Sequence, residues 1–126
     1  MNTLLVFLGA GLGGVLRHGV NLASARAWGT AFPWGTLGVN VVGSLLMGAL
    51  AAWLFARGGE GWREPVRLFL GTGVLGGFTT FSAFSLDAVA LWERGEAGTA
   101  ALYVAASVGL SVLGLAAGLA AVRVLP

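Results

Sequence analysis

The sequence predicts an all-α membrane protein that crosses the bilayer four times. Of its 126 residues, 57% are hydrophobic and only 10% are charged, whereas a water-soluble domain carries roughly 25% charged residues. The apolar residues form four long segments separated by short polar connections. Each segment is close to or above the about 20 residues that a helix needs to cross the hydrocarbon core. We therefore expect a single transmembrane domain over residues 1–126.

The expected helices cover residues 3–24, 35–56, 66–92 and 99–122. The first segment has neither a basic start nor a small-residue cleavage site, so we interpret it as a span rather than a signal peptide. Most aromatic residues of the connections fall beside the segment ends, as in the aromatic belts of membrane proteins. Four spans place both termini on the same side of the membrane.

The orientation is only weakly specified by the basic residues. Arg57, Arg63, Arg67 and Arg123 fall on the side of the termini, and Arg26 and Arg94 fall on the other. This excess favours cytoplasmic termini, but its small size leaves open insertion in both orientations with antiparallel pairing. Four short helices can hardly enclose a polar path, so we expect a homo-oligomer surrounded by lipid.

The third segment contains the most unusual stretch, GGFTTFSAF at residues 76–84. Hydrocarbon tolerates irregular backbone only where protein or water satisfies the freed N–H and C=O groups. Glycine and polar residues at this depth therefore predict a break at residues 76–80 and a functional site beside it. The carbonyls freed by a break suit a hard cation such as sodium.

Two phenylalanines and an asparagine are candidate ligands for an anion. Phe81 and Phe84 are three residues apart and share a helix face, and the positive edge of an aromatic ring is a weak partner for an anion. Core packing is the alternative interpretation of this pair. Asn40 lies within the second segment. It either makes a helix–helix hydrogen bond or offers its two amide donors to an ion.

The fourth segment carries a polar stripe. Tyr103, Ser107 and Ser111 are spaced by four residues, although a single serine in a membrane helix often bonds its own helix backbone. In the first segment, Arg17 either ties helices together or attracts anions, and His18 is expected to reach toward the interface. Asp87, near the end of the third segment, is expected at the interface as well.

Several function classes are excluded or disfavoured. With one His, no Cys and no Glu within the membrane, the nucleophile and base pairs of hydrolases cannot be assembled, so the chain is not expected to be an enzyme. The arginines are dispersed, which argues against nucleic acid as a partner. A small four-helix multidrug-type exporter is the main alternative. It needs a carboxylate in the membrane, and the first two segments have none.

Together these motifs resemble the Fluc or CrcB family of fluoride channels. The matching pieces are GLGGVLR at residues 11–17, GTLGVNVVGSLLMG at 35–48 and GVLGGFTTFSAF at 73–84, and the likeness covers nearly the whole chain. The resemblance implies a fluoride-selective channel in the inner (plasma) membrane that lets fluoride leave the cytoplasm passively. It also implies an antiparallel dual-topology homodimer with two pathways along its interface.

The resemblance assigns roles to particular residues. Phe81 and Phe84 would turn their ring edges to fluoride. Asn40 and Ser82 would donate to the ion, and Tyr103, Ser107 and Ser111 would line its path. A structural, untransported sodium ion (Na+) would be held by the main-chain carbonyls of Gly76 and Thr79 from both subunits, and Arg17 matches the arginine of the family's first helix.

Three positions depart from the family pattern. Ala83 stands where a threonine is common, His18 replaces a frequent tyrosine, and Leu115 is apolar where a hydroxyl is common. These departures leave the roles of the three positions open.

Overall fold

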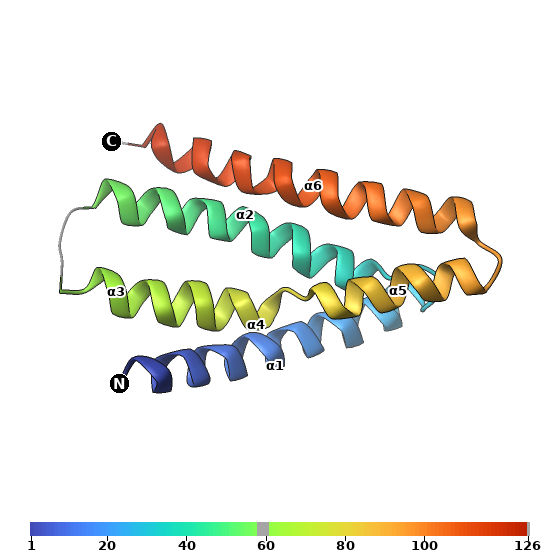
Figure 1. Ribbon diagram of the computed structural model, residues 1–126, viewed down its shortest axis with the longest axis horizontal. Helices are drawn as coiled ribbons and strands as arrows, with labels where there is room; N and C mark the ends of the chain where they lie inside the picture. Colours follow the sequence, from blue (N-terminus) through green and yellow to red (C-terminus); the bar gives the residue numbers. More distant parts are fainter. Residues whose placement is uncertain (58–60, 126) are drawn as a thin grey trace.

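The computed structural model describes residues 1–57 and 61–125, and its regular elements are all helical. The long apolar helices are α1 (Asn2–Trp28), α2 (Trp34–Ala56), the third span (Arg63–Glu93) and α6 (Ala97–Arg123). In Figure 1 they lie side by side in the order α1, third span, α2 and α6, with both termini at one end. All four are long and apolar enough to cross a membrane. The prediction of a four-span, multi-pass membrane protein is confirmed.

Several helices extend further than their apolar segments. The first helix continues to Trp28 instead of residue 24, the third span already begins at Arg63, and α6 begins at Ala97. Helix ends are set by backbone conformation and not by apolarity. Gly29 and Gly95, with φ of 75° and 80°, follow α1 and α5 closely, and glycine adopts this left-handed region without a Cβ penalty.

The third span is made of four pieces. They are α3 (Arg63–Val66), the π-helical η1 (Arg67–Leu75), α4 (Gly76–Phe78) and α5 (Phe81–Glu93). Between α4 and α5, Thr79 and Thr80 have extended backbone, with ψ of 158° and 122°. Gly76 and Gly77 are helical, so the irregular backbone is confined to the last two residues of the predicted 76–80 stretch.

Glycines bring helix backbones together at two contacts. A Cβ on Gly13 or Gly77 would collide with the backbone of the facing helix, which is Val74 for the first and Ala10 for the second. Gly48 and Gly118 do the same between α2 and α6. In lipid, such small residues allow the close packing that stabilises helix pairs. Gly77 therefore serves packing on α1 and not an irregular backbone, whereas a Cβ on Gly76 would approach only Gly71 of its own span.

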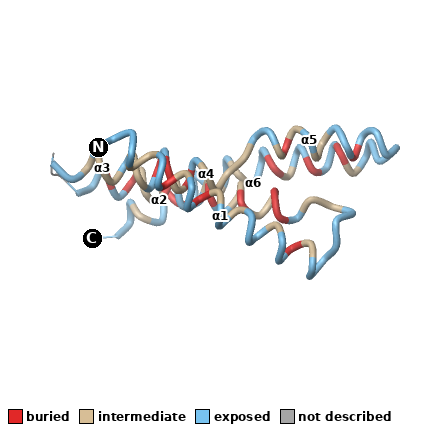
Figure 2. Tube along the Cα trace, turned by 90° about the horizontal axis from the view of Figure 1, so that it is seen from below, coloured by how far each residue is buried: buried red, intermediate tan, exposed pale blue. Residues whose placement is uncertain are grey.

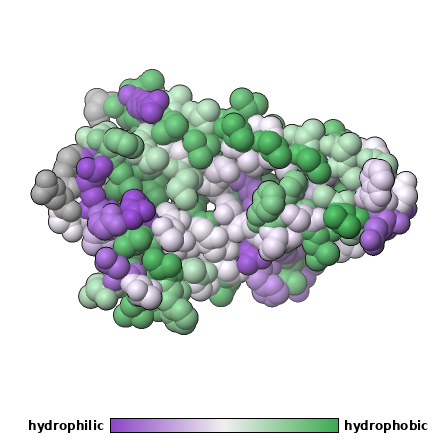
Figure 3. Space-filling model, viewed as in Figure 1, coloured by the Kyte–Doolittle hydropathy of each residue, from purple (hydrophilic) through white to green (hydrophobic). Residues whose placement is uncertain are grey.

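The surface of the chain is apolar and its interior is small. Val39, Leu91 and Tyr103 are fully buried, whereas large apolar side chains such as Phe7 and Phe55 are largely exposed. In Figure 2 exposed residues, coloured pale blue, occur along every helix. In Figure 3 hydrophobic green lies along the upper edge and over much of the right part, pale residues fill the middle, and hydrophilic purple gathers at the two ends and in a patch below the middle. This distribution suits helices surrounded by lipid.

Candidate functional site

The extended pair in the third span is bonded to the side chain of Asn40 on α2. Asn40 Nδ2 donates to the Thr80 carbonyl over 3.0 Å, and the Thr80 N–H donates to Asn40 Oδ1 over 2.8 Å. One amide therefore satisfies both backbone groups of a residue that lies outside any helix, as irregular backbone in a membrane requires. The amide retains a second N–H donor, because an asparagine carries two.

The neighbouring hydroxyls cap the two helix ends. Thr80 Oγ1 accepts from the Ala83 N–H at 3.2 Å, and Thr79 Oγ1 donates to the Leu75 carbonyl at 3.0 Å. In an unbroken α-helix, the Thr80 and Ala83 N–H groups would bond the carbonyls of Gly76 and Thr79. Both donors are instead used by side chains. The carbonyls of Gly76 and Thr79 are thereby deprived of their ordinary helical donors.

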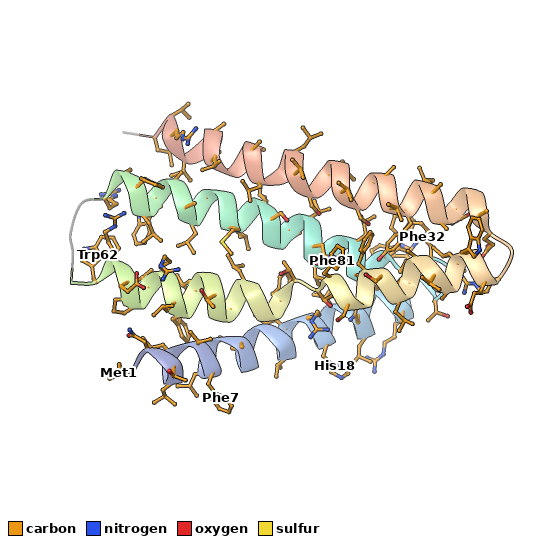
Figure 4. All side chains as sticks on the ribbon, viewed as in Figure 1. Met1, Phe7, His18, Phe32, Trp62 and Phe81 are labelled. Carbon is orange, nitrogen blue, oxygen red and sulfur yellow. The ribbon has the colours of Figure 1, made fainter. Side chains whose placement is uncertain are left out.

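A groove of about 390 Å³ lies between α2, the extended pair and α6. Five of the seven residues predicted for the fluoride pathway line it: Asn40, Phe81, Phe84, Ser107 and Ser111. Figure 4 shows Phe81 beside the interruption, at the start of α5. The fold therefore brings together residues that are 71 positions apart, counted from Asn40 to Ser111.

The groove contains a hydroxyl that is not used by the protein. Ser107 is 5% exposed, and within the described part of the chain its Oγ has no hydrogen-bond partner. A buried polar atom without a partner costs free energy unless something else bonds it. By contrast, Ser85 on α5 donates back to the Phe81 carbonyl of its own helix. Ser107 is thus a candidate donor to a small ligand in the groove, with the neighbouring Tyr103 hydroxyl as the competing partner.

The two groove phenylalanines differ in exposure. Phe81 is 77% exposed and Phe84 only 9%, with ring centroids 5.5 Å apart at an angle of 48°. Phe84 packs in turn on Tyr103, at a centroid distance of 5.3 Å. One ring is therefore fixed in the interior, and the other covers the groove from its open side.

Tyr103 and Ser82 do not line the groove but lie next to it. Tyr103 is fully buried behind Phe84, and its hydroxyl donates to Asp87 Oδ2 at 3.3 Å. Ser82 is exposed, and its Oγ lies 3.4 Å from Thr80 Oγ1. Asp87, which the sequence predicts at the interface, is half-buried and reaches the polar stripe of α6.

A second polar stripe, on α2, was not predicted. Thr36, Asn40 and Ser44 are spaced by four residues; Thr36 is 6% exposed, and the other two line the groove. Asn40 and Ser44 share the groove with Ser107 and Ser111 of the α6 stripe. The same four-residue spacing that identified the α6 stripe could have revealed this one, because residues four apart share a helix face.

The remaining predicted residues lie around the groove. Gly76 lines a second cavity of about 840 Å³ between α2 and η1, and Thr79 lines the groove itself. Arg17 Nε donates to the Gly77 carbonyl over 3.1 Å.

Of the three positions that depart from the family pattern, Ala83 supplies the capped N–H and Leu115 lines the groove. The third, His18, is exposed and projects from α1 in Figure 4.

The described residues that line the groove are all uncharged. They offer hydroxyl and amide donors together with aromatic rings. A multidrug-type exporter requires a carboxylate in its path, and none is found among these lining residues. The arrangement is suited to a small ion that exchanges its hydration water for neutral donors.

Residues 4–119 match the family of CrcB-like proteins, described as Camphor Resistance (CrcB). The chain belongs to the CrcB family. It is 60% identical over 123 residues to a protein of Nitrobacter hamburgensis named fluoride-specific ion channel FluC 2, with 98% of each chain covered. Membership of this family confirms the resemblance predicted from the motifs.

Other CrcB relatives carry a similar name. Proteins called fluoride-specific ion channel FluC from Rhodopseudomonas palustris and Methylobacterium nodulans are each 58% identical to the chain. The first match covers 98% of both chains, and the second covers 98% of this chain and 97% of the relative. These comparisons also confirm the prediction that this member of the CrcB family is not an enzyme.

Proposed function

We propose that this chain is a fluoride-selective channel of the inner membrane, through which fluoride leaves the cytoplasm passively. The observation that carries the proposal is the unpartnered Ser107 hydroxyl in a groove shared with Asn40 and the two phenylalanines. The names of the relatives supply the ion.

The chemistry of the groove fits fluoride. Fluoride is small and strongly hydrated, so a pathway must replace several water hydrogen bonds at once. Hydroxyls of Ser107 and Ser111 and the second N–H of Asn40 provide donors, and the edges of Phe81 and Phe84 add weak positive potential. Because these groups are neutral, they hold the ion without trapping it, as conduction requires. Ser82 and Tyr103 add two hydroxyls next to this set, and that of Tyr103 is held by its bond to Asp87.

We further propose that Thr79 and Thr80 form the predicted break of the third span, and that a structural sodium ion is held there. The carbonyls of Gly76 and Thr79 are the proposed ligands, and their helical donors are the two that side chains divert. Carbonyl oxygens suit a hard cation. Two carbonyls fill only a small part of such a coordination shell, so the same pair from a second subunit would complete it.

The partner in this proposal is a second copy in antiparallel orientation. The nearly balanced arginines permit insertion in both directions. Gly76 is exposed, Thr79 is half-buried and Phe81 is 77% exposed, so one proposed sodium ligand and the open side of the groove are accessible to another subunit. Two copies related by a two-fold axis would enclose two grooves.

The test is ion efflux from liposomes that contain the purified protein, followed with fluoride and chloride electrodes. We expect rapid fluoride release and chloride release close to that of empty vesicles. Asn40→Asp should lower fluoride flux sharply, because a carboxylate removes the amide donor and repels an anion, while dimers still form. Fluoride release no faster than from empty vesicles would refute the proposal.

A genetic test is independent of purification. Deletion of the gene should make cells sensitive to fluoride, and expression of the intact chain should restore resistance. Restoration by the Ser85→Ala variant but not by Ser107→Ala would show which serine is needed, since Ser85 already bonds its own helix. Equal restoration by both variants would remove Ser107 from the pathway.

A further inference from the structure

Arg17 is a charged residue in the middle of a membrane helix. It is the sixteenth of the 27 residues of α1 and is half-buried. The ion pairs of the described residues join Arg67 to Glu64 and Arg94 to Glu96, so no described carboxylate neutralises Arg17. A charge within the membrane is costly and marks a functional position by default. What Arg17 does contact is a main-chain carbonyl.

The contact links α1 to the last turn before the extended pair. Arg17 Nε donates to the Gly77 carbonyl at 3.1 Å, across 60 residues of sequence. In a continuous α-helix, this carbonyl would accept from the Phe81 N–H. The extended backbone of Thr79 and Thr80 interrupts that register. The guanidinium therefore takes the place of the missing helical donor.

The carbonyls of Gly76 and Thr79, which lie before and after that of Gly77, do not gain a replacement donor within the described part of the chain. Those of Gly76 and Thr79 lose their helical donors to Asn40 and to the Thr80 hydroxyl, and no replacement donor is found for them among the described hydrogen bonds between elements. Arg17 thus occupies one carbonyl of the turn, and the two proposed sodium ligands stay available.

The packing of α1 makes this contact rigid. Gly9, Gly13 and Arg17 are spaced by four residues and share one helix face. A Cβ on Gly9 or Gly13 would collide with the backbone of η1 or α4, and the Phe78 nitrogen would lie only 2.8 Å from a Cβ on Gly13. Gly9, Gly13 and Arg17 therefore face the third span together, and Arg17 lies one turn beyond Gly13, where the two backbones come closest.

We infer that Arg17 is a positioning residue for the cation site: it holds the Gly77 carbonyl so that the carbonyls of Gly76 and Thr79 are the ones presented to the ion. This inference rests on the proposed function. In this role Arg17 acts as a hydrogen-bond donor to the Gly77 carbonyl. A purely electrostatic role would instead be fulfilled by any positive charge nearby. Lysine at this position keeps both a charge and a donor, and methionine keeps neither.

The test measures sodium dependence in the purified full-length protein. Melting temperature and fluoride efflux are followed while NaCl replaces N-methylglucamine chloride at constant ionic strength. We expect Arg17→Met to raise the half-maximal sodium concentration by about tenfold or more, the size of effect seen when outer-shell partners of metal ligands are removed. Arg17→Lys should stay within about threefold of the wild type. The control Arg26→Met, at an exposed arginine of the same helix, should match the wild type.

The outcomes separate this inference from the proposed function. Unchanged sodium dependence in Arg17→Met, or a lower yield of folded protein with the wild-type sodium requirement, would overturn the positioning role. A wild type that shows no sodium effect at all would also overturn it, even if fluoride passes. A wild type that is stabilised by sodium but releases no fluoride would refute the channel alone. If Arg17→Met does not fold, Arg17→Gln is measured instead, because it removes the charge but keeps an N–H donor. A sodium requirement within about threefold of the wild type would support the hydrogen-bonding role, and a rise of about tenfold would overturn it.

Discussion

The two halves of the third span are held by different means. The half before the extended pair, η1 and α4, packs on α1 through glycines, with backbone against backbone. The half after it, α5, packs on α6 through aromatic side chains, with Phe84 against Tyr103. The first half presents main-chain carbonyls, and the second presents aromatic rings and hydroxyls. Such a division would suit the proposed function, in which main-chain carbonyls bind a cation and side chains line the path of an anion.

The difference predicts opposite responses to changes in side-chain size. The α5 half should be damaged when atoms are removed. Tyr103→Ala should cost about 3 kcal/mol of stability, at the low end for loss of a buried aromatic ring, because lipid and not water is the alternative environment. Tyr103→Phe keeps the ring and loses the hydroxyl with its bond to Asp87, so it should cost about 1 kcal/mol. Thermal unfolding in detergent measures both, and equal losses would contradict the packing argument.

The junction between the halves depends on Asn40. Replacement of Asn40 with Leu removes the partner of the Thr80 N–H and C=O, and each unsatisfied group costs about 1–3 kcal/mol. We expect faster hydrogen exchange at Thr80, measured by mass spectrometry, together with lower thermal stability. Val42→Leu is the control, because Val42 is 46% exposed and lies two positions from Asn40 on the same helix. Unchanged exchange in Asn40→Leu would mean that the extended pair is stabilised by something else.

The α1 half should be damaged when a single atom is added. Gly13→Ala places a methyl group against the backbone of Val74 and Phe78, and we expect a loss of about 1–3 kcal/mol from overpacking. Gly14→Ala is the matched control, since a Cβ there meets nothing within 4 Å. Its stability should be unchanged or slightly raised, because alanine favours a helix over glycine. Similar melting temperatures for both variants would refute the close approach of α1.

The smallest effect is expected away from both halves. Arg94 and Glu96 form an exposed pair beyond α5, with nearly half of each side chain accessible. Such pairs contribute little, so Glu96→Gln should change stability by less than about 0.5 kcal/mol. Fluoride efflux should be unaffected. A large loss would show that the connection between α5 and α6 controls the groove.

The sequence predicts the spans and most of the groove because hydrophobicity and four-residue spacing are local signals. Asn40, Phe81, Phe84, Ser107 and Ser111 were all identified in this way and meet at one groove. The glycines were harder to interpret. Gly76 and Gly77 look like a helix break, but they lie in a helix, and the glycine at 77 serves close packing on α1.

The side chains that bond the backbone around the extended pair could not be predicted either. That Asn40 bonds Thr80 and Arg17 bonds Gly77 depends on which helices become neighbours. The sequence alone shows a polar residue in each helix but not the register between them. For the same reason, the bond from Tyr103 to Asp87 was not predicted.

We propose above all that fluoride passes along the groove beside the extended pair. A matched pair of phenylalanine variants tests this most directly. Phe81 borders the groove, whereas Phe7 lies on α1 and is 72% exposed away from it. Fluoride efflux from liposomes should fall by about tenfold or more in Phe81→Ile, which corresponds to about 1.4 kcal/mol in the barrier. Phe7→Ile should conduct like the wild type. Wild-type flux through folded Phe81→Ile protein would contradict the account.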